Sequence, residues 1–376
     1  AYMNDFRPVK EYEIMNKDNI IGHMTIGYDG IHLNNIYGGI TKAIYNYSDF
    51  LFERTKLQDR ANIAKMAKIA RIDNEDSFIT KTSLVSVTDC IWVREKGSST
   101  CWDSVSPWRN SIGRIWANLA LDGRSSLSYK SIKERFKTPQ FSLGGATDKC
   151  VIKENGTLKL IKGADIDNSD RTGNKACAEY IAYNLAKLIG IKNHVEYKLR
   201  YNNSMVYCVC DIFSNEDMAF VTNRNSRYGL MRVHDIAKSI GGNNGEILNN
   251  MRILDAITLN FDRHDSNFGY LYNTDTYEIK SVASIFDNDS SLLTHIQVSV
   301  VAFDKAYDEA LDMMEYMDKP VDYIAVNNMT TNMEKRLYEI NGKIKVPRLK
   351  GMSELRRKYI EKMVNLRVAE ILKVCK

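Results

Sequence analysis

The residues best suited to chemistry lie in one short stretch, Asp262-Arg-His-Asp-Ser-Asn267-Phe-Gly269, which is followed by Ile285-Phe-Asp287. An Asp, four intervening residues, an Asn and a second Asp soon afterwards form the spacing of kinase-type phosphoryl-transfer sites. In such a site the first Asp accepts or orients the proton of the attacking hydroxyl. The Asn and the second Asp hold the magnesium ions that bridge the nucleotide phosphates.

A helix, a loop and a hairpin are expected to position these residues. Upstream, four apolar residues repeat at helical spacing, namely Ile247, Met251, Leu254 and Ile257. Downstream, Phe268–Tyr272 and Tyr277–Phe286 have the pattern of two strands joined by a turn at 273–276. Such a hairpin would bring Asn267 at its entry beside Asp287 at its exit, where amide and carboxylate oxygens can bind hard divalent cations.

A structural interpretation of the same residues has to be weighed. Asp and Asn are common in turns, and Asp-x4-Asn alone occurs by chance in many chains. On this interpretation Asp287 and Asp289 are solvated loop residues and His264 is an ordinary hydrogen-bonded histidine. The ordered succession of helix, loop and hairpin favours the phosphoryl-transfer site.

A nucleotide-binding region is predicted upstream, around the small-residue loop Ser142–Lys149. Backbone N–H groups of such a loop can surround phosphate oxygens. Residues 150–153 and Thr157–Lys162 have the pattern of two strands joined by an Asn-Gly turn. Lys162 ends an apolar strand face, where a buried ammonium needs an anionic partner such as a nucleotide phosphate. The alternative is a lysine that snorkels from the strand end. The residues predicted to contact the cofactor are Gly144, Gly145, Ala146, Thr147, Lys149, Lys162 and His264.

Glu179 is the predicted protein partner of Lys162. Apolar residues repeat at helical spacing from Asn174 to Leu188, and Gly190 stands at the expected C-terminal cap. Glu179 belongs to the N-terminal part of this helix, from which its carboxylate can reach back to the sheet. A Lys–Glu pair of this kind positions nucleotide phosphates in kinases. A solvated glutamate on the helix surface is the alternative.

The stretch from Asp262 to Gly269, followed by Ser284-Ile-Phe-Asp287, resembles the catalytic and metal-binding loops of HipA-like serine/threonine kinases. It is most similar to the bacterial and phage-associated branch that includes CtkA-like proteins. The Asp-Arg-His-x-x-Asn form is also similar to phosphatidylinositol kinases. The resemblance implies Asp262 as catalytic base, Asn267 and Asp287 as magnesium ligands, and ATP and Mg²⁺ as cofactors.

The resemblance extends from residue 80 to residue 295, with some departures. Many relatives have Pro where this chain has Ser284, and a Tyr and a Glu where it has Ile91 and Asp103. In HipA-type enzymes a serine of the phosphate loop is autophosphorylated and silences the enzyme, and Gly144 falls at that position. Autophosphorylation, an antitoxin-like partner and nucleic-acid association therefore stay open.

The expected architecture is α+β, a bilobal protein-kinase-like fold with an N-terminal accessory region. We expect an accessory region at 1–139, a nucleotide-binding small lobe at 140–213 and a mostly helical catalytic lobe at 214–376. The aromatic residues of the accessory region are expected to be core rather than ligand contacts.

Composition restricts the remaining classes. In 376 residues no apolar run approaches membrane-spanning length, and no His-Glu-x-x-His motif indicates a zinc hydrolase. Seven cysteines without metal-ligand spacing suggest free thiols, so we expect a cytoplasmic protein.

The C-terminal segment is basic, with eleven Lys or Arg and three Glu from residue 343 onward. The apolar residues there follow a helical stripe, namely Ile360, Val364, Val368, Ile371 and Cys375. This basic face is either solvated or a docking surface for acidic partners, nucleic acid included.

These patterns together predict an ATP- and Mg²⁺-dependent kinase whose substrate is a protein serine or threonine. A lipid or small-molecule kinase is the nearest alternative, because of the Asp-Arg-His form. A nucleotide-binding pseudokinase that acts as a regulatory or DNA-associated protein is the alternative from another class. The complete set of Asp262, Asn267 and Asp287 favours an active enzyme.

Overall fold

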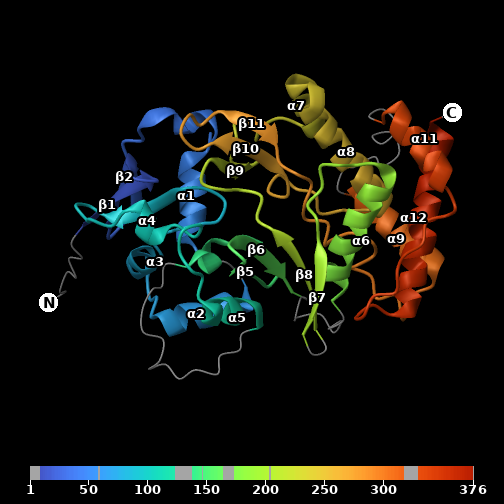
Figure 1. Cartoon of the computed structure of the whole chain (residues 1–376), viewed down its shortest axis with the longest axis horizontal. Helices are drawn as coiled ribbons and strands as arrows, with labels where there is room; N and C mark the ends of the chain where they lie inside the picture. Colours follow the sequence, from blue (N-terminus) through green and yellow to red (C-terminus); the bar gives the residue numbers. More distant parts are fainter. Residues whose placement is uncertain are drawn as a thin grey trace. The chain divides into compact units, whose positions relative to one another are not determined.

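A computed structural model describes residues 9–57, 60–122, 138–145, 147–163, 173–202, 205–316 and 329–375. Helices and strands both occur along the chain, and they do not alternate regularly (Figure 1), so the predicted α+β class is confirmed. The chain forms two compact units, each assembled from three segments. Unit 1 comprises 1–161, 211–229 and 270–281, and unit 2 comprises 162–210, 230–269 and 282–376.

Unit 1 begins with an antiparallel sheet in the strand order β3-β2-β1-β4. Its register pairs Ile14 with Val93 and Met24 with Tyr12. These apolar side chains are almost fully buried, because one face of the sheet packs into the core. The strands are β1 (Lys10–Asn16), β2 (Asn19–Gly27), β3 (Gly30–Asn34) and β4 (Ile91–Glu95).

The helices of unit 1 precede and follow β4. They are η1 (Gly38–Lys42), α1 (Tyr47–Thr55), α2 (Ala61–Ala70), α3 (Glu75–Thr82), α4 (Trp102–Val105), α5 (Arg114–Asp122) and η2 (Pro139–Ser142). Trp92 and Trp102 are fully buried in one cluster, against which Trp108 packs. The predicted role of these aromatic residues as core is therefore confirmed.

Two further groups of strands complete unit 1. β5 (Lys149–Glu154) and β6 (Thr157–Lys162) are joined at Asn155 and Gly156, both with positive φ, as an Asn-Gly hairpin requires. A separate sheet has the order β11-β10-β9, formed by β9 (Met218–Thr222), β10 (Gly269–Asn273) and β11 (Ile279–Val282). The predicted hairpin after the catalytic loop is thus present, although β11 ends well before Phe286.

The described residues of unit 2 are mostly helical and include the antiparallel strands β7 (Lys198–Asn202) and β8 (Met205–Asp211). Its helices are α6 (Asn174–Ile189), α7 (Val233–Ile240), α8 (Gly242–Thr258), α9 (Phe303–Tyr316), α11 (Thr331–Ile340) and α12 (Glu354–Val374). The glycines at the start of α8 do not break it. A Cβ on Gly245 would lie 2.5 Å from the carbonyl oxygen of Ala237, so glycine there lets α7 and α8 approach closely.

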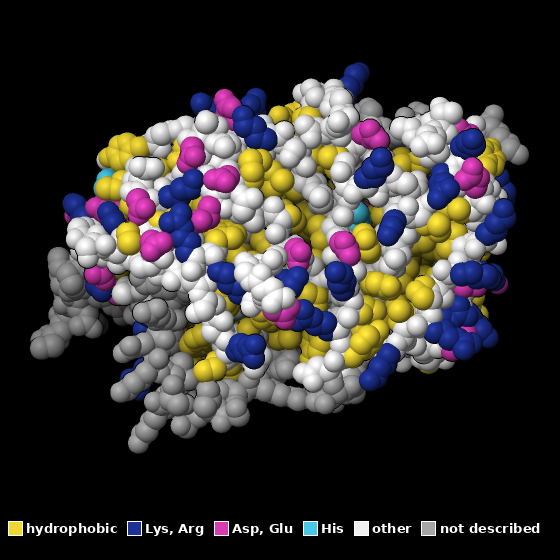
Figure 2. All heavy atoms as spheres, in the orientation of Figure 1, with side chains coloured by type: hydrophobic (Ala, Val, Ile, Leu, Met, Phe, Trp, Pro, Cys, Tyr) yellow, Lys and Arg dark blue, Asp and Glu magenta, His cyan; other side chains and the backbone are white. Residues whose placement is uncertain are grey.

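The basic C-terminal segment forms α12, and its predicted apolar stripe is buried from Ile360 to Ile371. Two of its arginines, Arg356 and Arg367, are also buried, so the outer face carries less charge than the count of residues suggests. Figure 2 shows Lys and Arg side chains gathered over the C-terminal helices. Among the described residues no helix is long and apolar enough to cross a bilayer, and none of the seven cysteines forms a disulfide.

Candidate active site

The predicted partnership of Lys162 and Glu179 is present within unit 2. Lys162, the last residue of β6, donates to the Glu179 carboxylate on α6 at 2.6 Å. Glu179 is fully buried and Lys162 is 4% exposed, so neither the snorkelling lysine nor the solvated glutamate describes them. The hydrophobic face of α6 places Glu179 among buried alanines, and a carboxylate there needs a cationic partner.

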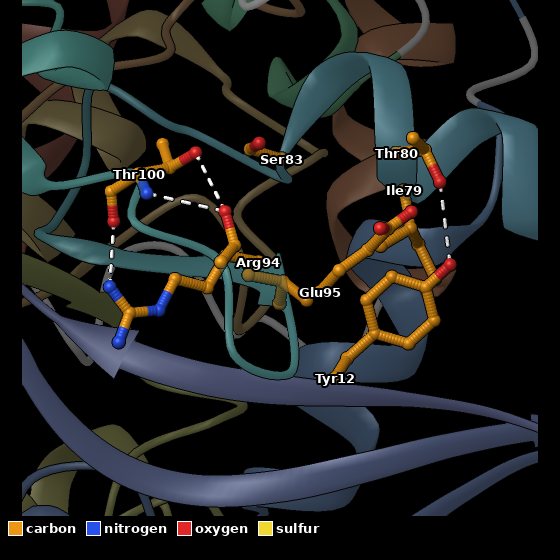
Figure 3. Close-up of a pocket in the computed structure, with 9 residues that line it drawn as sticks. Tyr12, Ile79, Thr80, Ser83, Arg94, Glu95 and Thr100 are labelled. Carbon is orange, nitrogen blue, oxygen red and sulfur yellow. Dashed lines mark hydrogen bonds between the residues drawn. The ribbon is translucent and has the colours of Figure 1, made fainter.

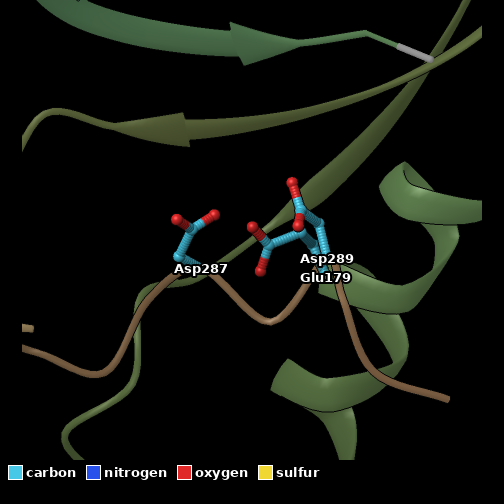
Figure 4. A group of neighbouring side chains, drawn as sticks. All are labelled: Glu179, Asp287 and Asp289. Carbon is cyan, nitrogen blue, oxygen red and sulfur yellow. The ribbon is translucent and has the colours of Figure 1, made fainter. Parts of the chain in front are cut away.

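Two aspartates of the loop after β11 complete the surroundings of Lys162. The Lys162 ammonium contacts the Asp287 carboxylate directly, and Oδ2 of Asp289 lies 3.3 Å away. Figure 4 shows Glu179 on its helix and both aspartates on the same loop. One ammonium with three donors therefore faces three carboxylates, each of which has one oxygen atom within 4.8 Å of an oxygen atom of the other two.

The electrostatics of this cluster follow from burial and from the excess of carboxylates. Burial alone would lower the pKa of the Lys162 ammonium, but Asp287, Asp289 and Glu179 outweigh it and hold that pKa well above its usual value. Burial raises the pKa of the Glu179 carboxyl, which Lys162 opposes and the two aspartates reinforce. The Lys162 side chain is therefore held in its charged form.

The predicted catalytic loop is held by hydrogen bonds between its side chains and its backbone. The Asp262 carbonyl accepts hydrogen bonds from the Asn267 side-chain amide and from the His264 backbone N–H, both at 2.9 Å. The Asp262 backbone N–H donates to the Asn260 side chain at 3.3 Å. The side chain of His264 accepts from the Ser266 backbone N–H within the loop and is exposed. Four intervening residues thus allow the Asn267 side-chain amide to reach the Asp262 carbonyl within one loop.

Arg263 joins this loop to the loop that carries Asp287. Its guanidinium forms a bidentate pair with Asp255 on α8, with both distances at 3.0 Å. The same group donates to the carbonyl oxygen of Asn267 at 2.7 Å and to the side-chain oxygen of Asn288 at 2.9 Å. Arg263 is 8% exposed, so these bonds are made away from solvent. The arginine therefore fixes Asn267 and the neighbour of Asp287 with one planar group.

Asn288, like Arg263, links separate segments of the site. Its backbone N–H donates to Glu179 at 2.8 Å, and its fully buried side chain contacts Nε2 of His194 at 3.0 Å. Nδ1 of His194 lies 2.7 Å from the Val195 carbonyl oxygen, which can only accept, so Nδ1 carries the proton and Nε2 accepts from Asn288. His194 therefore serves the site as a neutral imidazole.

His194 should make the stability of the protein sensitive to acid. Burial lowers its pKa from 6.5 to about 4. In the unfolded chain His194 takes up a proton near pH 6.5, whereas in the folded chain it does so only near pH 4. The contribution of neutral His194 to the free energy of unfolding is therefore fully present above pH 6.5 and is lost as the pH falls toward 4. From pH 7 to pH 4.5 the titration of His194 should lower the free energy of unfolding by about 2 to 3 kcal/mol.

Urea unfolding of wild type and His194→Asn at those two pH values measures the effect. The wild type should lose about 2 to 3 kcal/mol more of its unfolding free energy than the variant does. An equal loss in both proteins would show that His194 does not resist protonation in the folded state.

The carboxylates of the cluster suit the divalent cation that the catalytic-loop motif implies. Mg²⁺ prefers oxygen ligands and binds through one or two carboxylates together with substrate phosphates. Both oxygens of Glu179 are bonded, to Lys162 and to the backbone of Asn288, so Asp287 and Asp289 are the better ligands. The Asn267 amide nitrogen is used within its loop, which leaves its oxygen as the group that can face a cation.

The predicted phosphate loop lies in unit 1, whereas Lys162, Glu179, Asp262, Asn267 and Asp287 lie in unit 2. Lys149 does not extend away from the loop, because its ammonium donates to the Gly144 carbonyl at 2.7 Å. Gly145 has φ +85°, a backbone conformation that favours glycine, whereas the Lys149 ammonium 2.7 Å from the position of a Cβ could move aside. Thr147 is buried, and Ala146 lies outside the described residues.

Sequence reasoning missed four residues that hold the site together, namely Asp255, Arg263, Asn288 and His194. Asp289 was weighed only as a solvated residue, yet it is 8% exposed and contacts Lys162. The available signal was the run Asp287-Asn-Asp289, since two carboxylates at alternate positions after a strand can both turn toward one cation. No local pattern pointed to His194.

A cavity of about 170 Å³ in unit 1 contains none of the predicted site residues. Figure 3 shows Tyr12 bonded to Thr80 and the Arg94 guanidinium bonded to Thr100 within it. Arg94 also pairs with Glu13 at 2.7 Å. The polar groups of this cavity thus serve the sheet and α3. Its lining residues are Tyr12, Ile79, Thr80, Ser83, Val93, Arg94, Glu95, Ser98 and Thr100.

Comparison with known proteins gives structural matches only, since no family model and no curated protein matches the chain. The proinflammatory kinase CtkA of Helicobacter pylori matches with a TM-score of 0.47 and 18% identity, over 62% of this chain and 91% of that chain. The HipA–HipB toxin–antitoxin system of Shewanella oneidensis MR-1, solved with its operator DNA, matches with a TM-score of 0.46 and 12% identity, over 96% of this chain and 99% of that chain.

Proposed function

We propose that this chain is an ATP- and Mg²⁺-dependent kinase of the HipA-like class that transfers the γ-phosphate to a serine or threonine of a protein. The observation that carries the proposal is the environment of Lys162. Its ammonium contacts Glu179 and Asp287, residues that separate motifs had assigned to phosphate positioning and to metal binding. Glu179 and Asp287 follow Lys162 by 17 and 125 positions in the sequence, and both carboxylates contact its side-chain nitrogen.

The roles follow from the chemistry of phosphoryl transfer. Such a transfer requires positioning and neutralisation of charge more than covalent participation by the protein. Magnesium, when bound, neutralises charge on the β- and γ-phosphates. Asp287 and Asn267 would hold it, and Asp289, which also contacts Lys162, is a further carboxylate able to bind it. Lys162, oriented by Glu179, holds the phosphates, and Asp262 orients the acceptor hydroxyl and accepts its proton.

The protein acceptor is proposed from the resemblance of the catalytic loop to HipA-like enzymes. An antitoxin-like partner is proposed on the same basis. A lipid acceptor is the alternative favoured by the Asp262-Arg-His sequence, and a pseudokinase is the alternative without transfer.

Asp287→Asn should abolish the increase in ATP affinity that magnesium confers, lowering the affinity in magnesium by at least about tenfold. Asparagine suits this test, because Asp287 has φ +62° and Asn adopts left-handed backbone more readily than other residues with a side chain. Calorimetric titration of ATP, with magnesium and with a chelator, measures both affinities.

Asp308→Asn provides the matched control, since it removes the same charge from an exposed position of α9. That variant should behave as wild type. If Asp287→Asn keeps the wild-type dependence on magnesium, Asp287 is not a metal ligand.

A further inference from the structure

The predicted phosphate loop of unit 1 runs from the last residue of η2, Ser142, to the first residue of β5, Lys149. One side chain from another part of unit 1 contacts the backbone at both of its ends. The Arg60 guanidinium donates through Nη2 to the Gln140 carbonyl at 3.0 Å and through Nη1 to the Lys149 carbonyl at 3.1 Å. A single rigid, planar group therefore holds η2 beside the start of β5.

The outer edge of β5 is bonded by side chains in the same region. Among the described strands, β5 has β6 as its only neighbour. The Gln140 side chain accepts from the Val151 N–H at 2.8 Å and donates to the Val151 carbonyl at 2.6 Å. Lys149 and Val151 are alternate residues of the strand, so their carbonyls point to the same edge. Arg60 and Gln140 thus together fix the path of the chain from η2 into β5.

Two further hydrogen bonds are made by residues of the loop itself. The Ser142 hydroxyl donates to the Val85 carbonyl at 2.6 Å. The Lys149 ammonium donates across the loop to the Gly144 carbonyl. Arg60 differs from both, because it is a charged donor from outside the loop and contacts both ends at once.

Helix α2 fixes Arg60 in turn. Arg60 is its N-terminal cap residue, and the Arg60 carbonyl accepts from the Ile63 N–H at 2.9 Å. α2 packs on α5, and α5 packs on β5 (Figure 1), with the Asn62 side chain donating to the Ala120 carbonyl at 3.4 Å. Arg60 is 3% exposed. Burial lowers the pKa of its guanidinium to about 10, which Asp148 opposes, so the group is charged at neutral pH.

We propose that Arg60 is a positioning residue for the nucleotide, which fixes the predicted phosphate loop before ATP arrives so that the backbone N–H groups of the loop can bind phosphate oxygens. This inference rests on the proposed function. Backbone N–H groups bind a phosphate when several of them point to one place. A loop that is ordered in advance spares the entropy of ordering it on binding. Arg60 acts through the loop backbone.

Hydrogen exchange measures the positioning directly. In the nucleotide-free wild type the amides of residues 143–149 should be protected, and Mg-ATP should protect them further. In nucleotide-free Arg60→Lys they should exchange about tenfold faster or more, because one ammonium cannot replace a guanidinium fork shared by two carbonyls. Ser142→Ala, which loses a single neutral hydrogen bond, should have a smaller effect in the same direction.

Arg54→Lys is the matched control within unit 1. Arg54 is also buried, and its Nη1 donates to two carbonyls, those of Leu84 at 3.4 Å and Ile91 at 3.0 Å, rather than to the phosphate loop. Its replacement should lower the free energy of unfolding without selectively loosening residues 143–149. Unprotected amides there in wild type, or equal loosening by both arginine variants, would overturn the positioning role.

Calorimetric titration with Mg-ATP tests the consequence for the nucleotide. Arg60→Lys should weaken the affinity for Mg-ATP about tenfold, whereas Arg54→Lys should bind Mg-ATP as wild type does. In ATP hydrolysis the KM for ATP should rise by a similar factor. The kcat at saturating ATP should stay near the wild-type value, because the substitution leaves Lys162 and Asp262 in place.

The same titration separates failure of this inference from failure of the proposed function. Wild-type affinity in Arg60→Lys, or an equal loss of affinity in Arg54→Lys, contradicts the role of Arg60. A wild type that binds Mg-ATP without further protection of residues 143–149 overturns the inference while the proposed function stands. A wild type that binds no Mg-ATP overturns the proposed function as well.

Discussion

Replacing Asp262 by asparagine should lower phosphoryl transfer by about 10²- to 10⁴-fold and leave Mg-ATP affinity nearly unchanged. An amide cannot accept the hydroxyl proton, although it has the shape of the carboxylate. The hydrogen bonds that hold the loop use the backbone of Asp262, its N–H toward Asn260 and its carbonyl toward Asn267. The substitution therefore removes the base and keeps the scaffold.

Transfer of labelled phosphate from ATP, together with calorimetric ATP affinity, measures the two quantities separately. Asp265→Asn is the matched control, because Asp265 is exposed and belongs to the same loop. This control should transfer phosphate as wild type does. Equal transfer by Asp262→Asn and wild type would remove Asp262 from the catalytic role.

Lys162→Met should both destabilise the protein and abolish tight nucleotide binding. The burial of Glu179 makes the first effect large, since removal of the ammonium leaves a fully buried carboxylate without its cation. Breaking one partner of a buried pair costs about 3 to 5 kcal/mol. A lysine that served only a ligand could be removed without this loss.

The double variant Lys162→Met with Glu179→Met separates the two roles. Removing both charges together should recover much of the lost stability, because a buried ion pair is often replaced by apolar residues at little cost. Nucleotide affinity should not recover, because no ammonium remains for the phosphates. Urea unfolding and ATP titration on the same samples give the comparison. Recovery of both properties would make the pair purely structural.

Local patterns in the sequence were sufficient to predict the helices and the hairpin that carry the candidate site residues. Helical spacing predicted α6 and α8, and the Asn-Gly turn predicted the hairpin that ends at Lys162. The spacing of Asp262 and Asn267 predicted that a single loop carries both residues. In each case the responsible interactions are short-range and each residue type has a local conformational preference.

Interactions between distant segments were not predictable in this way. Arg263 bonds to Asp255 and Asn288, and nothing in the spacing of these residues indicates that they meet. The burial of His194 and the inward orientation of Arg356 depend on how helices pack, which a single sequence does not specify.

The most direct test of the account is incubation of the wild-type protein with γ-labelled ATP, Mg²⁺ and a degenerate serine/threonine peptide library, followed by identification of the labelled residue by mass spectrometry. The account predicts a phosphate ester on serine or threonine, formed together with an equal amount of ADP and absent from the Asp262→Asn reaction. Tight binding of Mg-ATP by a protein that labels neither itself, nor any peptide, nor a cell lysate would contradict it. Label found only in a lipid extract would instead identify a lipid kinase.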